Sequence, residues 1–190
     1  NLFVVFGSNY FEAEQYARWM DHTVTRAKER GMKVIVVEPR LSAPGAKADQ
    51  WIPIRPGKDV AMVMAMTRLL IDAGQFDEPF LITYTNAPQL VGADGKVIRD
   101  PEGKALVWDT TSNSAKPFVD GVTPALRGAY KVDGKSVTTG FDVYADSLKK
   151  MTPEAAADIC GVPAQTIRDL AALIGKEARI GTTTRIGDFS

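Results

Sequence analysis

Short apolar runs alternate with an amphipathic stretch at the start of the chain. The runs Leu2–Phe6 and Lys33–Val37 are typical of parallel strands that helices cover on both faces. Between them, apolar residues recur at helical spacing from Tyr16 to Ala27, and Gly31 ends the segment. The pattern predicts a strand, a helix and a second strand, joined by the right-handed crossover that parallel sheets almost always use.

The next segment predicts a third strand and a second helix. The stretch "QWIPI" reads as a short strand, and Pro53 favours the edge or the end of a sheet. A helix is expected from Asp59 to near Gly74. Its predicted core-facing stripe is Val60, Val63, Met64, Thr67, Leu70 and Ile71. We interpret residues 1–75 as a nucleotide-binding βαβ core.

The residue pattern of the chain after position 75 falls into two parts. Residues 76–140 carry Asp-Gly and Gly-Lys turns between short apolar runs ("GADGKV", "DPEGK", "VDGK"), which predicts an irregular excursion of β-hairpins. Residues 141–190 predict short helices, one capped by Thr152 with Pro153 in its first turn and one after Pro163. The final stretch "ARIGTTTRIGDFS" reads as a further strand. The predicted fold is α/β: a Rossmann-like, three-layer parallel sheet forming one domain of a larger subunit.

Composition narrows the class of protein. The 190 residues have a formal net charge of zero, which argues against a nucleic-acid partner. The one cysteine, Cys160, excludes an internal disulfide and a multi-thiolate metal cluster built from this chain. No apolar run reaches the roughly 20 residues of a membrane helix, so no direct membrane insertion is expected. A first strand that begins at Asn1 indicates a piece of a longer protein. The sequence leaves three locations for the parent protein: the periplasm, the membrane through a partner, or the cytoplasm.

Polar residues gather where the predicted strands end. Ligands of open parallel sheets bind beyond the carboxyl ends of the strands. At the first end, Gly7 permits close approach of a ligand to the backbone. At the second, Glu38 can accept hydrogen bonds from ribose hydroxyls, and Arg40 can reach a phosphate or stack on a base. At the third, Asp59 can accept a bidentate pair from a guanine edge. One nucleotide would satisfy all three ends.

Simpler interpretations compete with this one. The "GSN" bend can be an ordinary turn, Glu38 a solvated acid paired with Arg40, and Asp59 a helix cap. Neither the glycine-rich dinucleotide fingerprint nor the phosphate loop is present, so ordinary NAD or ATP binding lacks sequence support. His22 is predicted to be exposed without a special role and Cys160 to be a packing residue. We therefore predict a binding edge, no catalytic residue and no metal ligand in this chain.

Four ordered blocks carry a resemblance to a known family: "GSNYFEA", "KVIVVEPRLSAPGAKADQWIPIRPGKDVAMVMAM", "FLITYTNAPQLV" and "MTPEAAADICGVPAQTIRDLA". Together they resemble the molybdopterin oxidoreductases of the dimethyl sulfoxide reductase type. The resemblance implies a fragment of a catalytic subunit whose molybdenum or tungsten is held by two molybdopterin guanine dinucleotides. This segment would bind one dinucleotide arm. The matching cofactor-binding positions are Gly7, Ser8, Asn9 and Glu12, then Glu38, Pro39, Arg40 and Ser42, then Gly57, Lys58 and Asp59.

Two of these positions depart from the family pattern, which often has Asp at the position of Glu38 and Thr at that of Lys58. The cysteine motif that holds an iron–sulfur cluster in many relatives is absent from this chain. The resemblance therefore places the cluster elsewhere in the parent, and it implies that the fragment is inactive by itself. It also implies partners, namely the other domains of the parent protein and an iron–sulfur electron-transfer subunit.

In the parent, the resemblance implies two-electron redox chemistry or oxygen-atom transfer. The stretches "ALVWDT" and "GVTPALRGAYKVDGK" resemble the thiosulfate and polysulfide reductase branch, which indicates a sulfur compound as the substrate. Two other functions remain open: a self-contained nucleotide-dependent dehydrogenase and a noncatalytic interaction module.

Overall fold

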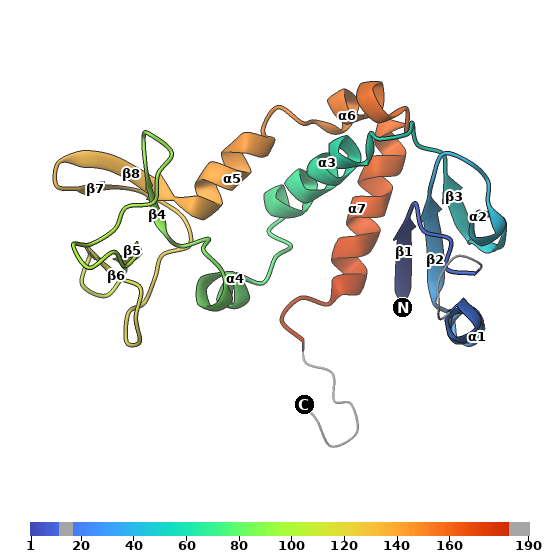
Figure 1. Ribbon diagram of the computed structural model, residues 1–190, viewed down its shortest axis with the longest axis horizontal. Helices are drawn as coiled ribbons and strands as arrows, with labels where there is room; N and C mark the ends of the chain where they lie inside the picture. The colour runs from blue at the N-terminus through green and yellow to red at the C-terminus, as the bar shows by residue number, and fades with distance from the viewer. Residues whose placement is uncertain (12–16, 183–190) are drawn as a thin grey trace, which may run out of the picture. The chain divides into compact units, whose positions relative to one another are not determined.

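The computed structural model of the protein describes residues 1–11 and 17–182. Its chain divides into two compact units, which are described separately below and can be followed by colour in Figure 1. Unit 1 combines Asn1–Gln75 with Lys150–Ser190, and unit 2 is Phe76–Lys149.

In the described part of unit 1, three strands form a parallel sheet in the order β1-β2-β3. The strands are β1 (Leu2–Phe6), β2 (Lys33–Val37) and β3 (Gln50–Ile52). Phe6 pairs with Val37 and Val37 with Ile52, so the three strands end level with one another. The three predicted strands and their parallel pairing are confirmed.

Helices border the sheet on both faces, which makes three layers (Figure 1). On one face, α1 (Ala17–Glu29) contributes Met20 and Val24 to an apolar cluster with the alternate strand residues Val5, Val34 and Val36. On the other face, Ile35, Val37 and Ile52 pack against three helices: α3 (Asp59–Asp72), α6 (Pro153–Cys160) and α7 (Ala164–Ala178). The predicted α/β three-layer class is confirmed.

The core-facing side of α3 differs from the predicted stripe. Its buried residues are Ala61, Met62, Ala65 and Met66, whereas Val60 and Val63 are exposed. The prediction was wrong because α3 is apolar on more than one side, so spacing alone cannot select the side that meets the sheet. Packing against α6 and α7 makes that selection.

Strand β1 also departs from expectation. The apolar run predicted a strand buried on both faces, yet of its five residues only Val5 is buried. In β2, by contrast, all four residues from Val34 to Val37 are buried. The difference arises because, among the strands that the structure describes, β1 is at the end of the sheet and has a neighbour on one side only.

The C-terminal helices begin and end at the predicted signals. Thr152 Oγ1 accepts a hydrogen bond from the Ala155 amide at 3.1 Å and caps α6, which ends at Gly161 in the left-handed conformation (φ +76°). Helix α7 follows Pro163 and buries Ile167, Leu170 and Ala171. With 15 residues it is longer than the short helix that we predicted. The predicted final strand is not seen in its described part, because Ala178 ends α7 and residues 179–182 form no strand. Its remainder, from residue 183 onwards, lies outside the described residues.

Arg55 joins the loop after β3 to the end of α6. Its guanidinium donates to the carbonyls of Asp158, at 2.6 Å, and Ile159, at 3.3 Å, and its amide donates to the Cys160 carbonyl at 2.8 Å. The last carbonyls of a helix lack partners within the helix and carry partial negative charge, so a cation there is stabilising.

We expect Arg55→Ala to lower the free energy of unfolding by about 1 kcal/mol, because two charge-assisted hydrogen bonds at the end of α6 are lost. Urea unfolding followed by circular dichroism measures this change. Arg30→Ala, at another exposed arginine of unit 1, is the matched control and should stay within about 0.5 kcal/mol of the parent protein. Equal effects of the two substitutions would contradict a capping role for Arg55.

Unit 2 is built from antiparallel strands and two helices. One sheet has the order β4-β8-β7, formed by β4 (Leu90–Gly92), β7 (Ala129–Val132) and β8 (Lys135–Thr139). A second pairs β5 (Leu106–Asp109) with β6 (Ser114–Pro117). The helices are α4 (Glu78–Tyr84) and α5 (Gly140–Leu148). The "VDGK" turn joins β7 to β8 with positive φ at Asp133 (+49°) and Gly134 (+76°), which confirms the predicted hairpin.

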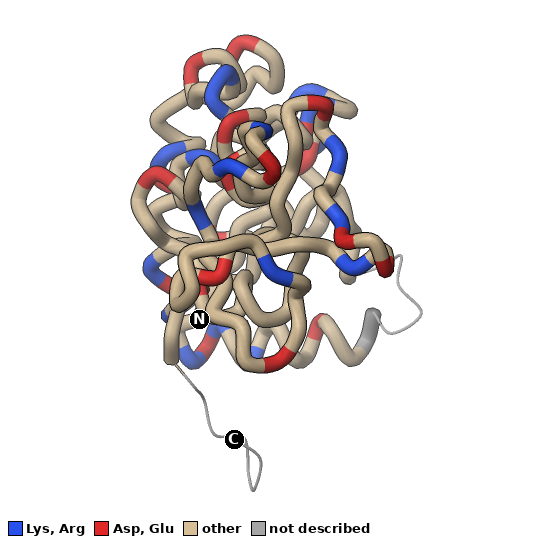
Figure 2. Tube along the Cα trace, turned by 90° about the vertical axis from the view of Figure 1, so that its left-hand side faces the viewer, with Lys and Arg blue, Asp and Glu red and all other residues tan. Residues whose placement is uncertain are grey.

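Acidic and basic residues are interspersed along the chain trace (Figure 2), in keeping with the net charge of zero. Within the described residues, no helix is both long enough and apolar enough to cross a membrane.

The short helix α2 (Ala43–Lys47) lies between β2 and β3 in the chain and contacts both strands. Ser42 caps it: the Ser42 hydroxyl accepts a hydrogen bond from the Gly45 amide at 3.4 Å. The first turn of α2 is therefore fixed directly beside the carboxyl end of β2.

Candidate functional site

The sheet register places two of the three predicted bends side by side. The Gly7 amide donates to the Val37 carbonyl at 3.0 Å, and the Glu38 amide donates to the Ile52 carbonyl at 3.1 Å. Gly7 and Glu38 therefore lie on the same edge, each at the first position beyond its strand. The third bend follows β3 and leads into α3, whose first residue is Asp59.

Backbone is open to close approach at two of the bends. Gly7 and Gly57 have φ values of +59° and +70°, a region that favours glycine. A Cβ atom built on either glycine would have no heavy atom within 4 Å, apart from its chain neighbours. The conformation, and not crowding, therefore requires glycine, and both positions leave space beside the backbone.

Glu38 is a buried carboxylate held in a fixed position. It is 8% exposed, and its Oε1 accepts hydrogen bonds from the Ser42 amide, at 3.2 Å, and from the Ser42 hydroxyl. Its backbone carbonyl accepts from the Trp51 indole at 3.1 Å. Its Oε2 has no hydrogen-bond partner among the residues that the structure describes. The interpretation of Glu38 as a solvated acid paired with Arg40 is therefore wrong: Arg40 is exposed, and the partner of Glu38 is Ser42.

Gly45 supports this arrangement and was not singled out from the sequence. A Cβ there would lie 3.1 Å from Glu38 Oε1 and 3.3 Å from a ring carbon of Trp51. A side chain at position 45 would therefore crowd the carboxylate and the indole, and either neighbour would have to shift by a few tenths of an ångström. The only signal in the sequence was the Pro-Gly pair at 44–45. Such a pair also occurs in ordinary turns, so it could not show that this glycine lies close to a carboxylate.

The third bend presents charge at the start of α3. Lys58 is exposed and occupies the cap position without a side-chain cap, while Asp59 is the first helical residue and is half-buried. The alternative in which Asp59 is the helix cap is therefore wrong. A carboxylate in the first turn is still stabilised by the partial positive charge of the helix N-terminus.

The remaining predicted positions are less constrained. Ser8 and Asn9 are half-buried, and Pro39 is exposed. Ser8 lines a hollow of about 440 Å³ together with Tyr10 and Met20. Glu12 lies outside the described residues. The eleven predicted cofactor positions remain a prediction.

Cys160 and His22 lie in the surroundings that the sequence predicted. Cys160 is fully buried in the unit 1 core, and His22 is exposed on α1. Among the described residues, no group of three or more His, Cys, Asp or Glu is arranged to hold a metal ion.

Comparison with known proteins identifies relatives along most of the chain. The molybdopterin oxidoreductase family profile matches residues 1–146. A sulfite dehydrogenase subunit of Allochromatium vinosum is 36% identical over 94% of this chain and 20% of its own length. Dimethyl sulfoxide reductase of Haemophilus influenzae is 34% identical over 92% of this chain and 18% of its own length. The chain thus spans about a fifth of the length of these curated relatives.

A solved structure shows the same fold. Acetylene hydratase from Pelobacter acetylenicus aligns with a TM-score of 0.56 and 17% identity, over 97% of this chain and 18% of its own. The family profile covers more than half of the chain, and the relatives include dimethyl sulfoxide reductase-type catalytic subunits, as the sequence resemblance predicted. The chain belongs to the molybdopterin oxidoreductase family.

Proposed function

We propose that unit 1 binds the guanine nucleotide arm of a molybdopterin guanine dinucleotide within the catalytic subunit of a molybdenum or tungsten oxidoreductase. The observation that carries the proposal is the level ending of β1 and β2, which sets an open glycine, Gly7, beside a buried, oriented carboxylate, Glu38. This is the edge at which open parallel sheets bind nucleotides.

The residues present fit such a group. The open backbone at Gly7 and Gly57 lets a phosphate or sugar approach the main chain. Glu38 accepts hydrogen bonds from ribose hydroxyls through Oε2, while Ser42 holds Oε1 and thereby orients the carboxylate. A pre-oriented acceptor loses little conformational entropy on binding. Ser42 is thus a positioning residue in this proposal as well as a predicted contact.

Asp59 supplies the base selectivity in this proposal. A carboxylate can accept two parallel hydrogen bonds from N1 and N2 of guanine, whereas adenine has no matching pair of donors on that edge. Arg40 and Lys58 are exposed cations that can pair with the phosphates. Ser8 and Asn9 complete the first bend.

The metal–pterin centre would supply the two-electron redox or oxygen-atom-transfer chemistry of the whole enzyme, and this chain would hold one arm of it without contributing a catalytic side chain. Because relatives include proteins named for sulfite, dimethyl sulfide and thiosulfate, we infer a sulfur compound as the substrate of the parent. The subunit designations of those relatives favour an assembly of several chains, in which we infer an iron–sulfur electron-transfer partner and a cluster outside this chain.

Equilibrium binding tests the proposal. Isothermal titration with GDP should show binding that exceeds that of ADP and NAD by at least about tenfold, since two hydrogen bonds distinguish guanine. Asp59→Asn should remove most of this preference, because an amide presents a donor where the guanine requires a second acceptor.

Asp72→Asn is the matched control, since Asp72 is an exposed acid at the far end of the same helix and pairs with Arg68. It should leave GDP affinity unchanged. Equal affinity for GDP and ADP, or equal loss from both variants, would contradict the proposal.

A further inference from the structure

The Glu38 carbonyl lies where the hydrogen-bond ladder between β2 and β3 stops. The Glu38 amide donates to the Ile52 carbonyl at 3.1 Å. In a regular parallel ladder, the Ile54 amide would donate back to the Glu38 carbonyl. Strand β3 instead ends at Ile52 and is followed by Pro53. Because Glu38 is a buried residue, its carbonyl needs a donor from another source.

The Trp51 side chain supplies that donor. Its indole Nε1 donates to the Glu38 carbonyl at 3.1 Å. Trp51 is half-buried, and its ring lies against α2, since a Cβ atom added to Gly45 would be 3.3 Å from the ring and 3.1 Å from Glu38 Oε1. The indole, α2 and the Glu38 carboxylate therefore pack against one another at the carboxyl end of the sheet.

Two main-chain hydrogen bonds fix the direction in which the Glu38 side chain leaves the backbone. The bond at its amide holds one peptide plane, and the indole bond at its carbonyl holds the next plane, between Glu38 and Pro39. That second plane begins the loop that leads to Ser42, whose amide and hydroxyl bind Glu38 Oε1. Rotation of the plane would move Ser42 relative to the carboxylate. The indole thus stabilises the contact that orients Glu38.

We propose that Trp51 is a positioning residue for nucleotide binding, which keeps Glu38 Oε2 turned towards the ribose hydroxyls by holding the Glu38 carbonyl. This rests on the proposed function, in which Oε2 accepts hydrogen bonds from the ribose. Trp51 acts through Glu38 and not by contact with the nucleotide. A pre-oriented acceptor raises affinity because less conformational entropy is lost on binding.

A packing role alone predicts a different result. If the indole merely filled space between β3 and α2, its truncation would weaken the binding of every nucleotide to the same extent. A positioning role affects the nucleotides that carry ribose hydroxyls and spares those that lack them. Comparison of two such ligands therefore distinguishes the roles.

Isothermal titration of the protein with GDP and with 2′,3′-dideoxy-GDP makes this comparison. The parent protein should prefer GDP by about tenfold, as expected for hydrogen bonds to a charged acceptor. Trp51→Phe keeps an aromatic ring and removes the donor, so the preference should fall to about threefold or less, with affinity for dideoxy-GDP within about twofold of the parent value. An unchanged preference, or an equal loss of affinity for both nucleotides, would overturn the proposal.

Trp108→Phe is the matched control, since it makes the same chemical change in unit 2, where Trp108 stacks on Tyr130. It should leave the preference at the parent value. A double-mutant cycle shows whether Trp51 acts through Glu38. Glu38→Gln should itself reduce the preference, and adding Trp51→Phe should reduce it no further. An additional loss in that background would overturn the proposal.

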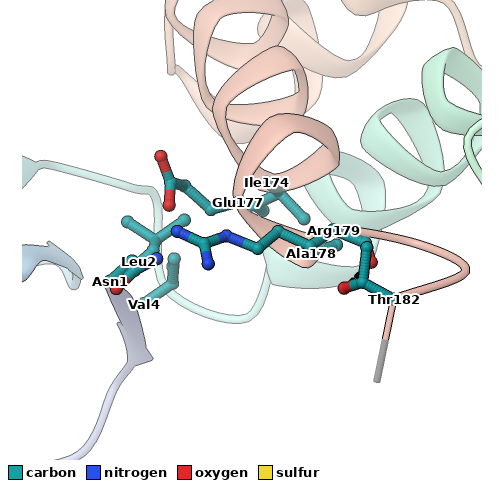
Figure 3. Close-up of a pocket in the computed structure, with 8 residues that line it drawn as sticks. All are labelled: Asn1, Leu2, Val4, Ile174, Glu177, Ala178, Arg179 and Thr182. Carbon is teal, nitrogen blue, oxygen red and sulfur yellow. Dashed lines mark hydrogen bonds between the residues drawn. The ribbon is translucent and has the colours of Figure 1, made fainter. Parts of the chain in front are cut away.

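Glu177→Gln is the control for Glu38→Gln. Glu177 lines a hollow of about 660 Å³ together with Asn1 and Leu2 (Figure 3). Leu2 pairs with Lys33, the first residue of β2, so this hollow is at the opposite end of the strands from Glu38. The same chemical change there should leave the preference for GDP unchanged. A matching loss would overturn the assignment of ribose recognition to Glu38.

Hydrogen exchange separates this inference from the proposed function, because it needs no nucleotide. The Ser42 amide donates to Glu38 Oε1 at 3.2 Å, so its exchange rate reports the position of the carboxylate. Trp51→Phe should accelerate exchange at Ser42 by at least about tenfold and leave the Arg55 amide, which donates to the Cys160 carbonyl, within about twofold of the parent rate. This acceleration without GDP binding would contradict the proposed function and still support the positioning of Glu38 by Trp51. Unchanged exchange at Ser42 would overturn the inference.

Discussion

Ile167→Ala is expected to lower the free energy of unfolding of the protein by about 3 kcal/mol, because truncation of a buried isoleucine loses transfer energy and leaves a cavity. Ile167 is completely buried on α7, in the cluster that contains Met62 and Ala65 of α3. The same cluster holds residues of β2 and β3, so this side chain joins the C-terminal helix to the N-terminal sheet within unit 1.

Ile159→Ala is the matched control, since it makes the same chemical change at a position on α6 that is 40% exposed. It should cost about 0.5 kcal/mol or less. Urea unfolding followed by circular dichroism measures both. Similar losses for the two variants would show that the α3–α6–α7 layer is not the stabilising core of unit 1.

This core explains which parts of the fold the sequence could predict. Hydrophobic periodicity, together with turn and cap residues, located the parallel strands, both helices of the βαβ core and the Thr152 cap. Each of these features depends on residues that are neighbours in the chain. The choice of the buried side of α3 depends on Ile167 and its neighbours, which enter from residues far away in sequence. Local pattern cannot supply that information when more than one side of a helix is apolar.

The candidate site also has features that the sequence could predict and features that only the fold determines. Gly7 and Glu38 were predictable because strand ends are local features and parallel pairing brings them together. The contact between Glu38 and Ser42, and the close approach of Gly45, follow from the path of α2. A sequence containing "EPRLSAPG" is equally compatible with a solvated acid paired with its neighbouring arginine. Only the fold shows that the acid is buried and that serine is its partner.

The edge position of β1 was hidden for a related reason. An apolar run indicates a strand with helices on both faces, and β1 does have helices bordering both faces. What the run cannot show is whether a neighbouring strand lies on each side. The end position of β1 among the described strands therefore follows from the fold and not from its own residues.

Asp109→Asn is expected to destabilise unit 2 by several degrees in melting temperature at pH 7, because this buried carboxylate connects β5 to two loops. Asp109 is 2% exposed. Its Oδ2 accepts from the Lys116 ammonium at 2.7 Å and the Ser112 hydroxyl at 2.6 Å, and its Oδ1 accepts from the Thr123 amide at 3.1 Å and the Thr111 amide at 3.2 Å. An amide side chain would turn a donor towards these donors and leave Lys116 without its counter-charge.

The effect should depend on pH in one direction. Lys116, followed by the Ser112 hydroxyl, holds the pKa of Asp109 well below its ordinary value of 3.8. A carboxyl group with a lowered pKa in the folded state stabilises fully above its unfolded pKa and loses that contribution as the pH falls towards the folded value. Calorimetry should therefore show a constant difference between the parent protein and Asp109→Asn from pH 7 to about pH 5, and a narrowing difference below about pH 4. Asp94→Asn, in an exposed turn of the same unit, should show neither effect, and a difference for Asp109→Asn that stayed constant down to pH 2 would mean that its carboxylate charge does not stabilise the hairpin.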